Sequence, residues 1–285
     1  MDTDRRYSSN GLLLSVRTVG RVTAGIMCVG FLLSVACAII FNFEITTRTH
    51  CGVSNYLPSI SAAIAEPPSC YLWRLAVTLC SAQRVFFTLV HYNMYSSILV
   101  NKAQYQWLCK LCFFLELTEN LGLIGLTCVS SVENHKAHEY FFIVFQTCAL
   151  LYMMILCMIH RLAITQGPVP TSQEYKTFMR KFTLFITNLV AFISALYFFY
   201  RHNRYCEPGV YTIFAFLEYV VVMSNILFHF MVTNNFKERE MKVGSRAGSR
   251  LKMYFNIACK YLQLAIKWIN LDEALIMWDS FSSKL

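Results

Sequence analysis

The chain has 285 residues, 56% of them hydrophobic and only 14% charged, and its formal net charge is +9. Soluble domains usually hold about 45–50% apolar and about 25% charged residues. The apolar residues gather in blocks long enough to cross a bilayer, which excludes a disordered chain, a nucleic-acid-binding module and a secreted disulfide scaffold. The sequence therefore predicts a polytopic membrane protein, in which the positive charge reports topology and no nucleic-acid partner is expected.

Six apolar segments have the length of a membrane span. The hydrocarbon core of a bilayer is about 30 Å thick and needs about 20 helical residues. Each span must be a helix, because backbone amides find no water in lipid, and all six prolines fall between the segments. The predicted fold is all-α, a six-transmembrane-helix bundle with spans at about 21–43, 71–98, 107–131, 139–162, 182–200 and 209–233.

The distribution of lysine and arginine predicts the orientation of this bundle, because these residues resist translocation. Eighteen of them lie in the terminal segments and in or beside the loops after spans two and four, against four in the other loops. We therefore expect both termini in the cytosol, with residues 1–20 as a cytosolic N-terminal segment. Loops 44–70, 132–138 and 201–208 then face the lumen or the exterior.

The C-terminal region 234–285 is predicted to be a cytosolic tail. Residues 234–250 are rich in charge and contain two glycines, as expected of a solvated linker. Polar residues then recur every three or four positions within an apolar run, which predicts an amphipathic helix at 251–281 lying in the membrane interface. A seventh span over the same residues is the alternative.

Most of the twelve cysteines lie within the proposed spans, where cysteine behaves as a small buried hydrophobic residue. Only Cys51, Cys70 and Cys206 face the oxidising side in this topology. We prefer a Cys51–Cys206 disulfide, provided that packing brings the two Cα atoms to about 4.4–6.8 Å. Cys109 and Cys112 form an isolated CxxC, which is weak support for a metal, so no metal site is assigned.

Ionisable residues within spans need a partner, since each costs about 2.5–3.5 kcal/mol or more in mid-membrane. At a rise of about 1.5 Å per residue, Arg84 in span two and Glu119 in span three lie at similar depths. This predicts an intramembrane Arg84–Glu119 ion pair, for which a purely structural role is the leading interpretation. Together with Glu116, Glu218 and Asn225, the pair suggests a polar cavity lined by spans two, three and six.

Four of the seven histidines lie on the side predicted to be luminal, and imidazole is a general base near neutral pH. They are His50, His135, His138 and His202. His138 is followed by Glu139, and His202 precedes Glu207 by five residues. An interfacial histidine is more often a hydrogen-bonded neighbour of lipid headgroups, and that interpretation stays open for each of them.

The predicted luminal loops carry long polar sequences within short connections. They include THCGVSNYLPS at 49–59 and YRHNRYCE at 200–207. Shorter related stretches lie at 73–74, 119–120, 129–133, 138–139, 142–145, 209–215, 217–219, 225 and 228–229. Over about residues 20–233, these sequences resemble the GPI-anchor-remodelling branch of the FRAG/DRAM/SFK membrane protein family.

The resemblance implies fatty-acid remodelling of GPI anchors by a multi-pass protein of the Golgi membrane, with the endoplasmic reticulum as the alternative. In this process lyso-GPI is reacylated at sn-2 with a saturated chain, a step required for the maturation and surface expression of GPI-anchored proteins. The implied partners are GPI-anchored proteins or the lyso-GPI lipid, the membrane, and other GPI-remodelling factors. Reacylation needs an acyl donor, whose identity the sequence does not give, but no cofactor.

Reacylation also needs a base for the lipid hydroxyl and donors for the tetrahedral oxyanion. We expect His202 to be the base, oriented by Glu207 or Glu139, with His138 as the second candidate. The candidate substrate-binding residues are His50, Asn55, Tyr56, Arg74, Asn120, Arg201, Asn203, Tyr211 and Glu218.

Other hypotheses remain open beside this one. A covalent acyl-enzyme on Ser130 or Ser131 is a variant of the enzymatic hypothesis. The rival hypothesis is a non-catalytic protein that binds GPI or lyso-lipid and presents it to a separate acyltransferase. A luminal metal-dependent hydrolase built from His50, His138 and His202 lacks regular ligand spacing. A channel or transporter is a further alternative because of the mid-membrane charges, although paired groups at one depth favour a structural clamp over a relay.

Overall fold

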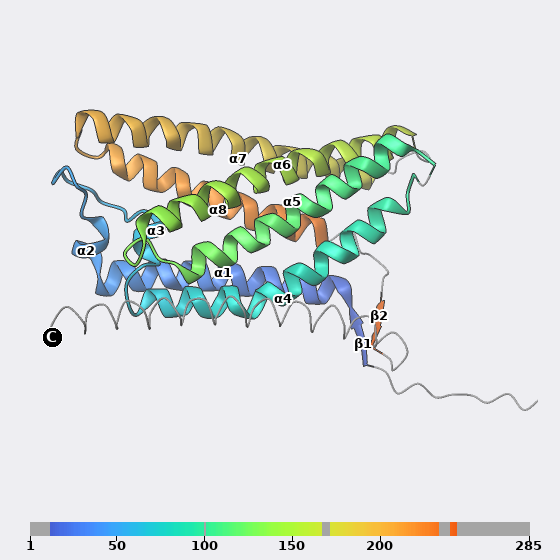
Figure 1. Ribbon diagram of the computed structural model, residues 1–285, viewed down its shortest axis with the longest axis horizontal. Coiled ribbons are helices and arrows are strands. Elements are labelled where there is room, and N and C mark those ends of the chain that lie inside the picture. The colour runs from blue at the N-terminus through green and yellow to red at the C-terminus, as the bar shows by residue number, and fades with distance from the viewer. Residues whose placement is uncertain (1–11, 100, 167–171, 234–239, 244–285) are drawn as a thin grey trace, which may run out of the picture. The chain divides into compact units, whose positions relative to one another are not determined.

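The structure is a computed structural model that describes residues 12–99, 101–166, 172–233 and 240–243 (Figure 1). The described residues fall into two compact units. The larger lies within residues 20–235, and the smaller is formed by the described segments that flank it.

The smaller unit contains two strands, β1 (Leu12–Ser15) and β2 (Glu240–Val243), which pair antiparallel with Leu12 opposite Val243. The sequence did not predict this ladder, because strands of four residues are too short for a period to be recognised. The all-α prediction holds for the larger unit. The predicted amphipathic helix at 251–281 lies outside the described residues.

The larger unit is built from helices. They are α1 (Val16–Phe41), α2 (Phe43–Thr47), α3 (Ile60–Ala63), α4 (Ser69–Ser96), α5 (Ala103–Cys128), α6 (His135–Gln166), α7 (Ser172–Tyr205) and α8 (Val210–Thr233). Several run past the predicted spans, as α7 does with 34 residues. Hydropathy marks only the apolar part of a helix, whereas backbone hydrogen bonding continues into the polar ends.

Five of these helices are long and apolar enough to cross a membrane, namely α1, α5, α6, α7 and α8. The chain is therefore a membrane protein. α4 has 28 residues, which is also long enough, but it carries Arg74 and Arg84 among other polar residues and is not one of the five.

Helices α5 and α6 pack side by side, as do α7 and α8 (Figure 1). Gly122 permits the close approach of α5 to α6, since a Cβ atom at this position would lie 3.1 Å from the Phe145 Cα atom. Core clusters around Tyr152 and Phe228, and around Phe31 and Trp73, fill the interior of the unit.

A buried polar network ties α7 to its neighbours. Asn188 Nδ2 donates to the Val221 carbonyl at 2.8 Å and to Ser224 Oγ at 2.9 Å, both on α8. Its Oδ1 accepts a hydrogen bond from Gln146 Nε2 on α6 at 3.2 Å. Such contacts hold helices together in lipid, because the hydrophobic effect does not drive the association of apolar helix surfaces there.

Helices α2 and α3 lie at one end of the larger unit, together with the α5–α6 and α7–α8 connections (Figure 1). We call this the disulfide end and define it as residues 42–68, 129–134 and 202–209. It contains most of the polar loop sequence that distinguishes this chain from a simple helix bundle.

Candidate functional site

Cys51 and Cys206 form a disulfide with their Cα atoms 5.4 Å apart, which confirms the pairing preferred from topology. The bond joins the loop after α2 to the turn between α7 and α8. The Gly209 N–H donates to the Ser54 carbonyl at 3.0 Å beside it, and Gly209 has a φ of +76°, a left-handed conformation that favours glycine. The disulfide end is thus fixed to the start of α8.

His202 lies against this disulfide and is fully buried. Its ring centroid is 4.8 Å from that of Tyr211 and 5.4 Å from that of His50. Neither ring nitrogen has a hydrogen-bond partner among the described residues. The structure therefore brings three predicted site residues together but gives His202 no group that would orient it as a base.

The expected orientation of His202 by Glu207 or Glu139 is not present. Glu207 Oε2 instead lies 2.7 Å from Arg201 Nε, and the two side chains are about 40% exposed. A guanidinium offers a carboxylate two parallel donors, which one imidazole nitrogen cannot match. Glu139 is exposed. Arg201, a candidate substrate-binding residue, is engaged by Glu207.

His138, the second candidate base, is buried and has a partner at each nitrogen. Its Nδ1 lies 2.7 Å from the Val129 carbonyl oxygen, and its Nε2 lies 3.1 Å from Ser61 Oγ on α3. A carbonyl oxygen only accepts, so Nδ1 carries the proton and Nε2 of the neutral ring is the acceptor. His138 thus faces a hydroxyl with its basic nitrogen.

The α5–α6 connection is held to α4 by an ion pair, in which Arg74 Nη2 lies 2.9 Å from Glu133 Oε1. Arg74 Nε also donates to the Thr127 carbonyl at 3.3 Å. Partial burial opposes ionisation of Glu133, but the Ser130 N–H, 2.7 Å from Oε2, and the Arg74 guanidinium outweigh it, so the pKa of Glu133 lies below its ordinary value. The ion pair thus holds the backbone on either side of Val129, whose carbonyl orients His138.

Glu218 does not line the predicted cavity but anchors α3. Its Oε2 accepts the Ile60 N–H at 3.1 Å, at the first residue of that helix. Tyr219 donates its hydroxyl to the Pro58 carbonyl at 2.9 Å, and Ser59 caps the helix by accepting the Ala62 N–H. The short α3 is therefore fixed to α8 on one side.

The remaining substrate-binding candidates differ in exposure. Asn55 is buried, where Nδ2 donates to the Thr47 carbonyl at 3.1 Å and Oδ1 accepts from Thr212. Tyr56 and Asn203 are exposed at the disulfide end, as is His50. These three are the candidates that a headgroup reaches without rearrangement.

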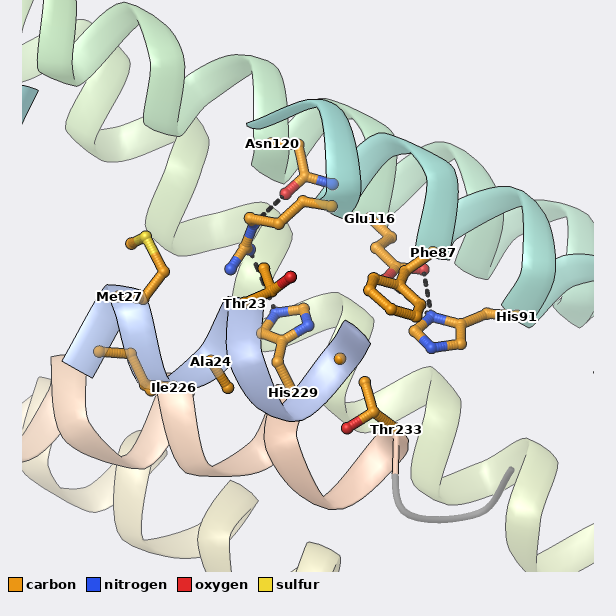
Figure 2. A pocket seen from close by; sticks show the side chains of 12 residues that line it. Thr23, Ala24, Met27, Phe87, His91, Glu116, Asn120, Ile226, His229 and Thr233 are labelled. Carbon is orange, nitrogen blue, oxygen red and sulfur yellow. Dashed lines mark hydrogen bonds and ion pairs between the residues drawn. The ribbon is translucent and has the colours of Figure 1, made fainter. Parts of the chain in front are cut away.

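A polar cluster separate from the contacts of His138 and His202 lies between α1, α4, α5 and α8. It surrounds a cavity of about 40 Å³ (Figure 2). Arg84 Nη2 lies 3.1 Å from Glu119 Oε1, the two residues that we paired from their depth. His229 Nε2 is 2.8 Å from the same oxygen, which also accepts from Asn225 Nδ2 at 3.3 Å. The Arg84 guanidinium further donates to Asn120 Oδ1.

His91 and Glu116 form a second histidine–carboxylate pair on the wall of this cavity, with His91 Nδ1 2.9 Å from Glu116 Oε1 (Figure 2). One water needs about 10–15 Å³ of such space, so the cavity admits a few waters but no acyl chain. Asn120, a candidate substrate-binding residue, belongs to this cluster instead.

Three of these residues were not identified from the sequence, namely His229 and His91 at the cavity and Ser61 beside His138. His229 follows Asn225 by four residues and His91 follows Arg84 by seven, spacings that place each pair on one helix face. That signal was present in the sequence. For Ser61 there was none, because a contact between the four-residue α3 and the distant His138 follows no period in the sequence.

The sequence matches the Frag1/DRAM/Sfk1/Cwh43P N-terminal domain over residues 16–238. A Xenopus tropicalis protein named acyltransferase PGAP2 is 38% identical over 80% of this chain and 90% of its own length. Proteins named post-GPI attachment to proteins factor 2 are 34% identical in Caenorhabditis elegans, over 78% and 88%, and 37% identical in Drosophila melanogaster, over 70% and 77%. No solved structure matches the chain.

Proposed function

We propose a function for this chain from one premise, which is that it belongs to the Frag1/DRAM/Sfk1/Cwh43P N-terminal domain family. The names of its relatives support a role in the maturation of GPI-anchored proteins, and the name of the Xenopus relative supports acyl transfer. The reaction is reacylation of lyso-GPI at sn-2 with a saturated fatty acid. The substrates are GPI-anchored proteins or the lyso-GPI lipid, and other remodelling factors act before it.

The protein spans the Golgi membrane six times with both termini in the cytosol. The Cys51–Cys206 disulfide supports this orientation, because disulfides persist in oxidising compartments. α4 is the sixth span, and the ion pairs of Arg74 and Arg84 lower the cost of its two charges. The disulfide end then lies in the leaflet that carries GPI anchors.

One observation carries the chemistry, namely the fixed tautomer of His138. Its Nδ1–H is held by the Val129 carbonyl, so Nε2 accepts the proton of a hydroxyl. Acyl transfer to a lipid hydroxyl requires that proton transfer. We therefore assign the base to His138 rather than to His202, whose nitrogens have no partner among the described residues.

The rival function is a non-catalytic lipid-presenting protein. It is favoured by the relatives that carry a factor name without an enzymatic term. It is also favoured by the disulfide end itself, where His50, Tyr56 and Asn203 are exposed and His202 is buried. In this alternative the exposed residues bind the headgroup and a separate enzyme transfers the chain.

To test this function, the chain is expressed in cells that lack their own homologue. The acyl composition of their GPI anchors is then measured by mass spectrometry. Wild-type protein and His135→Ala should restore saturated sn-2 chains, whereas His138→Ala should not. His135 is an exposed histidine one turn away on the same helix, so it controls for loss of a histidine. Restoration by His138→Ala would favour lipid presentation, and no change with wild-type protein would refute the remodelling role.

A further inference from the structure

We propose that Ser61 is the nucleophile of the acyl transfer and carries the fatty acid as a transient ester. The inference rests on the proposed function and adds to it a covalent intermediate and the residue that bears it. It differs from the covalent route on Ser130 or Ser131, which the sequence left open as a variant. The reason for choosing Ser61 is that His138 Nε2 faces its hydroxyl, whereas no histidine faces Ser130 or Ser131 among the described residues.

Ser61, His138 and Val129 form a nucleophile, base and orienting group in series. Ser61 Oγ lies 3.1 Å from His138 Nε2, within hydrogen-bond reach, and His138 Nδ1 lies 2.7 Å from the Val129 carbonyl oxygen. The carbonyl takes the place of the carboxylate that orients histidine in a serine hydrolase triad. This arrangement activates a hydroxyl that is otherwise a weak nucleophile.

The two serines of the α5–α6 connection have other roles. Ser130 is buried, and its Oγ accepts the Glu133 N–H at 3.3 Å. Ser131 Oγ donates to the Ser61 carbonyl at 3.4 Å and so helps to position the nucleophile. Neither hydroxyl faces a histidine ring nitrogen in any contact among the described residues.

Ser61 is both accessible and fixed in place. It is partly exposed, whereas His138 is 5% exposed and so is shielded behind it. α3 is anchored by Glu218 at the Ile60 N–H and on its other side by Ser131. A hydroxyl that is held before the substrate arrives loses little entropy in the reaction.

The acyl donor is a saturated ester of a membrane phospholipid. The disulfide places Ser61 at the oxidising face of the membrane, away from cytosolic thioesters. Ser61 Oγ bonds to the acyl carbonyl carbon while His138 Nε2 takes the hydroxyl proton. The donor's ester C–O bond then breaks, and His138 returns the proton to the departing lysophospholipid oxygen.

The second half of the reaction reverses these roles. The sn-2 hydroxyl of lyso-GPI attacks the ester carbon on Ser61 and gives its proton to His138. The bond between the acyl carbon and Ser61 Oγ breaks, and the serine oxygen regains the proton. One ester is exchanged for another without oxidation or reduction, so no further reactant is required.

The first experiment looks for the intermediate. Purified full-length protein is incubated with vesicles of phosphatidylcholine bearing alkyne-tagged saturated chains, without an acceptor, and tagged peptides are identified by mass spectrometry. We expect the tag on Ser61 in the wild type and in Ser54→Ala, whose exposed serine lies in the same connection between α2 and α4. We expect no tag in Ser61→Ala, and labelling at least about 100-fold slower in His138→Ala.

The second experiment adds lyso-phosphatidylinositol and measures transfer of the tagged chain. Ser61→Cys keeps a nucleophile and should form a thioester that neutral hydroxylamine cleaves, which a merely structural hydroxyl would not produce. Transfer by Ser61→Ala at the wild-type rate would overturn the proposal while leaving the acyltransferase function intact. Transfer by the wild type with no tag on Ser61 would do the same. If the wild type fails to change GPI anchors in cells, the proposed function itself falls.

Discussion

Glu119 Oε1 lies 2.8 Å from His229 Nε2, and the Glu119 side chain is fully buried between helices α5 and α8. The same oxygen accepts from Arg84 on α4, so one carboxylate joins three helices. An isolated charge in this position would cost several kcal/mol. The cluster is therefore stable only while its charges compensate each other.

Replacing Glu119 by Gln should destabilise the protein by about 3–5 kcal/mol, because it leaves the Arg84 charge buried without its counter-ion. The measurement is the thermal unfolding midpoint of detergent-purified protein. Glu44→Gln is the matched control, since Glu44 is exposed on α2. The double variant Glu119→Gln with Arg84→Met should recover part of the loss. Equal midpoints for Glu119→Gln and the control would contradict this account.

Replacing Cys51 by Ser should cost about 2–5 kcal/mol of stability. The disulfide closes a loop with a sequence separation of 155 residues, and its loss frees that chain in the unfolded state. Cys206→Ser should give the same value, and the two together no more than either alone. Cys37→Ser, at a free and partly exposed cysteine, is the control. A double variant with the summed effect of the two single variants would argue against the bond.

The contacts that the sequence predicted are those that depend on how deep each residue lies in the membrane. Arg84 and Glu119 lie on consecutive helices, so a count of residues places them at one level. Cys51 and Cys206 follow from topology, which leaves few cysteines on the oxidising side. In both cases the depth of each residue along the membrane normal is enough to identify its partner, and hydropathy gives that depth.

The contacts that the sequence could not predict depend on competition between neighbours. Glu207 is six residues from Arg201 and five from His202, and spacing does not tell which of them it binds. The contact of Ser61 with His138 joins a four-residue helix to a distant span. The fold of the bundle was thus accessible from sequence, whereas the partners of the histidines required coordinates.

The Arg74–Glu133 ion pair should make stability depend on acid pH. Because the pKa of Glu133 is lowered in the folded state, its contribution is complete above the unfolded pKa of about 4.3 and is lost as the pH falls through the folded value. Unfolding midpoints of wild type and Glu133→Gln should therefore converge at low pH. Arg74→Gln should weaken the same dependence. A constant difference between wild type and Glu133→Gln would show that the pair does not titrate with folding.

Two glycine substitutions should change the stability of the protein in opposite directions. Gly122→Ala places a Cβ atom 3.1 Å from the backbone N and Cα of Phe145, and backbone atoms yield less readily than a side chain. We expect a loss of about 1 kcal/mol or more from overpacking of α5 against α6. Gly25→Ala meets nothing within 4 Å on α1 and should gain about 0.5–1 kcal/mol of helix propensity. Unfolding midpoints in detergent compare the two, and a stabilising Gly122→Ala would mean that α5 and α6 do not approach as closely as this packing requires.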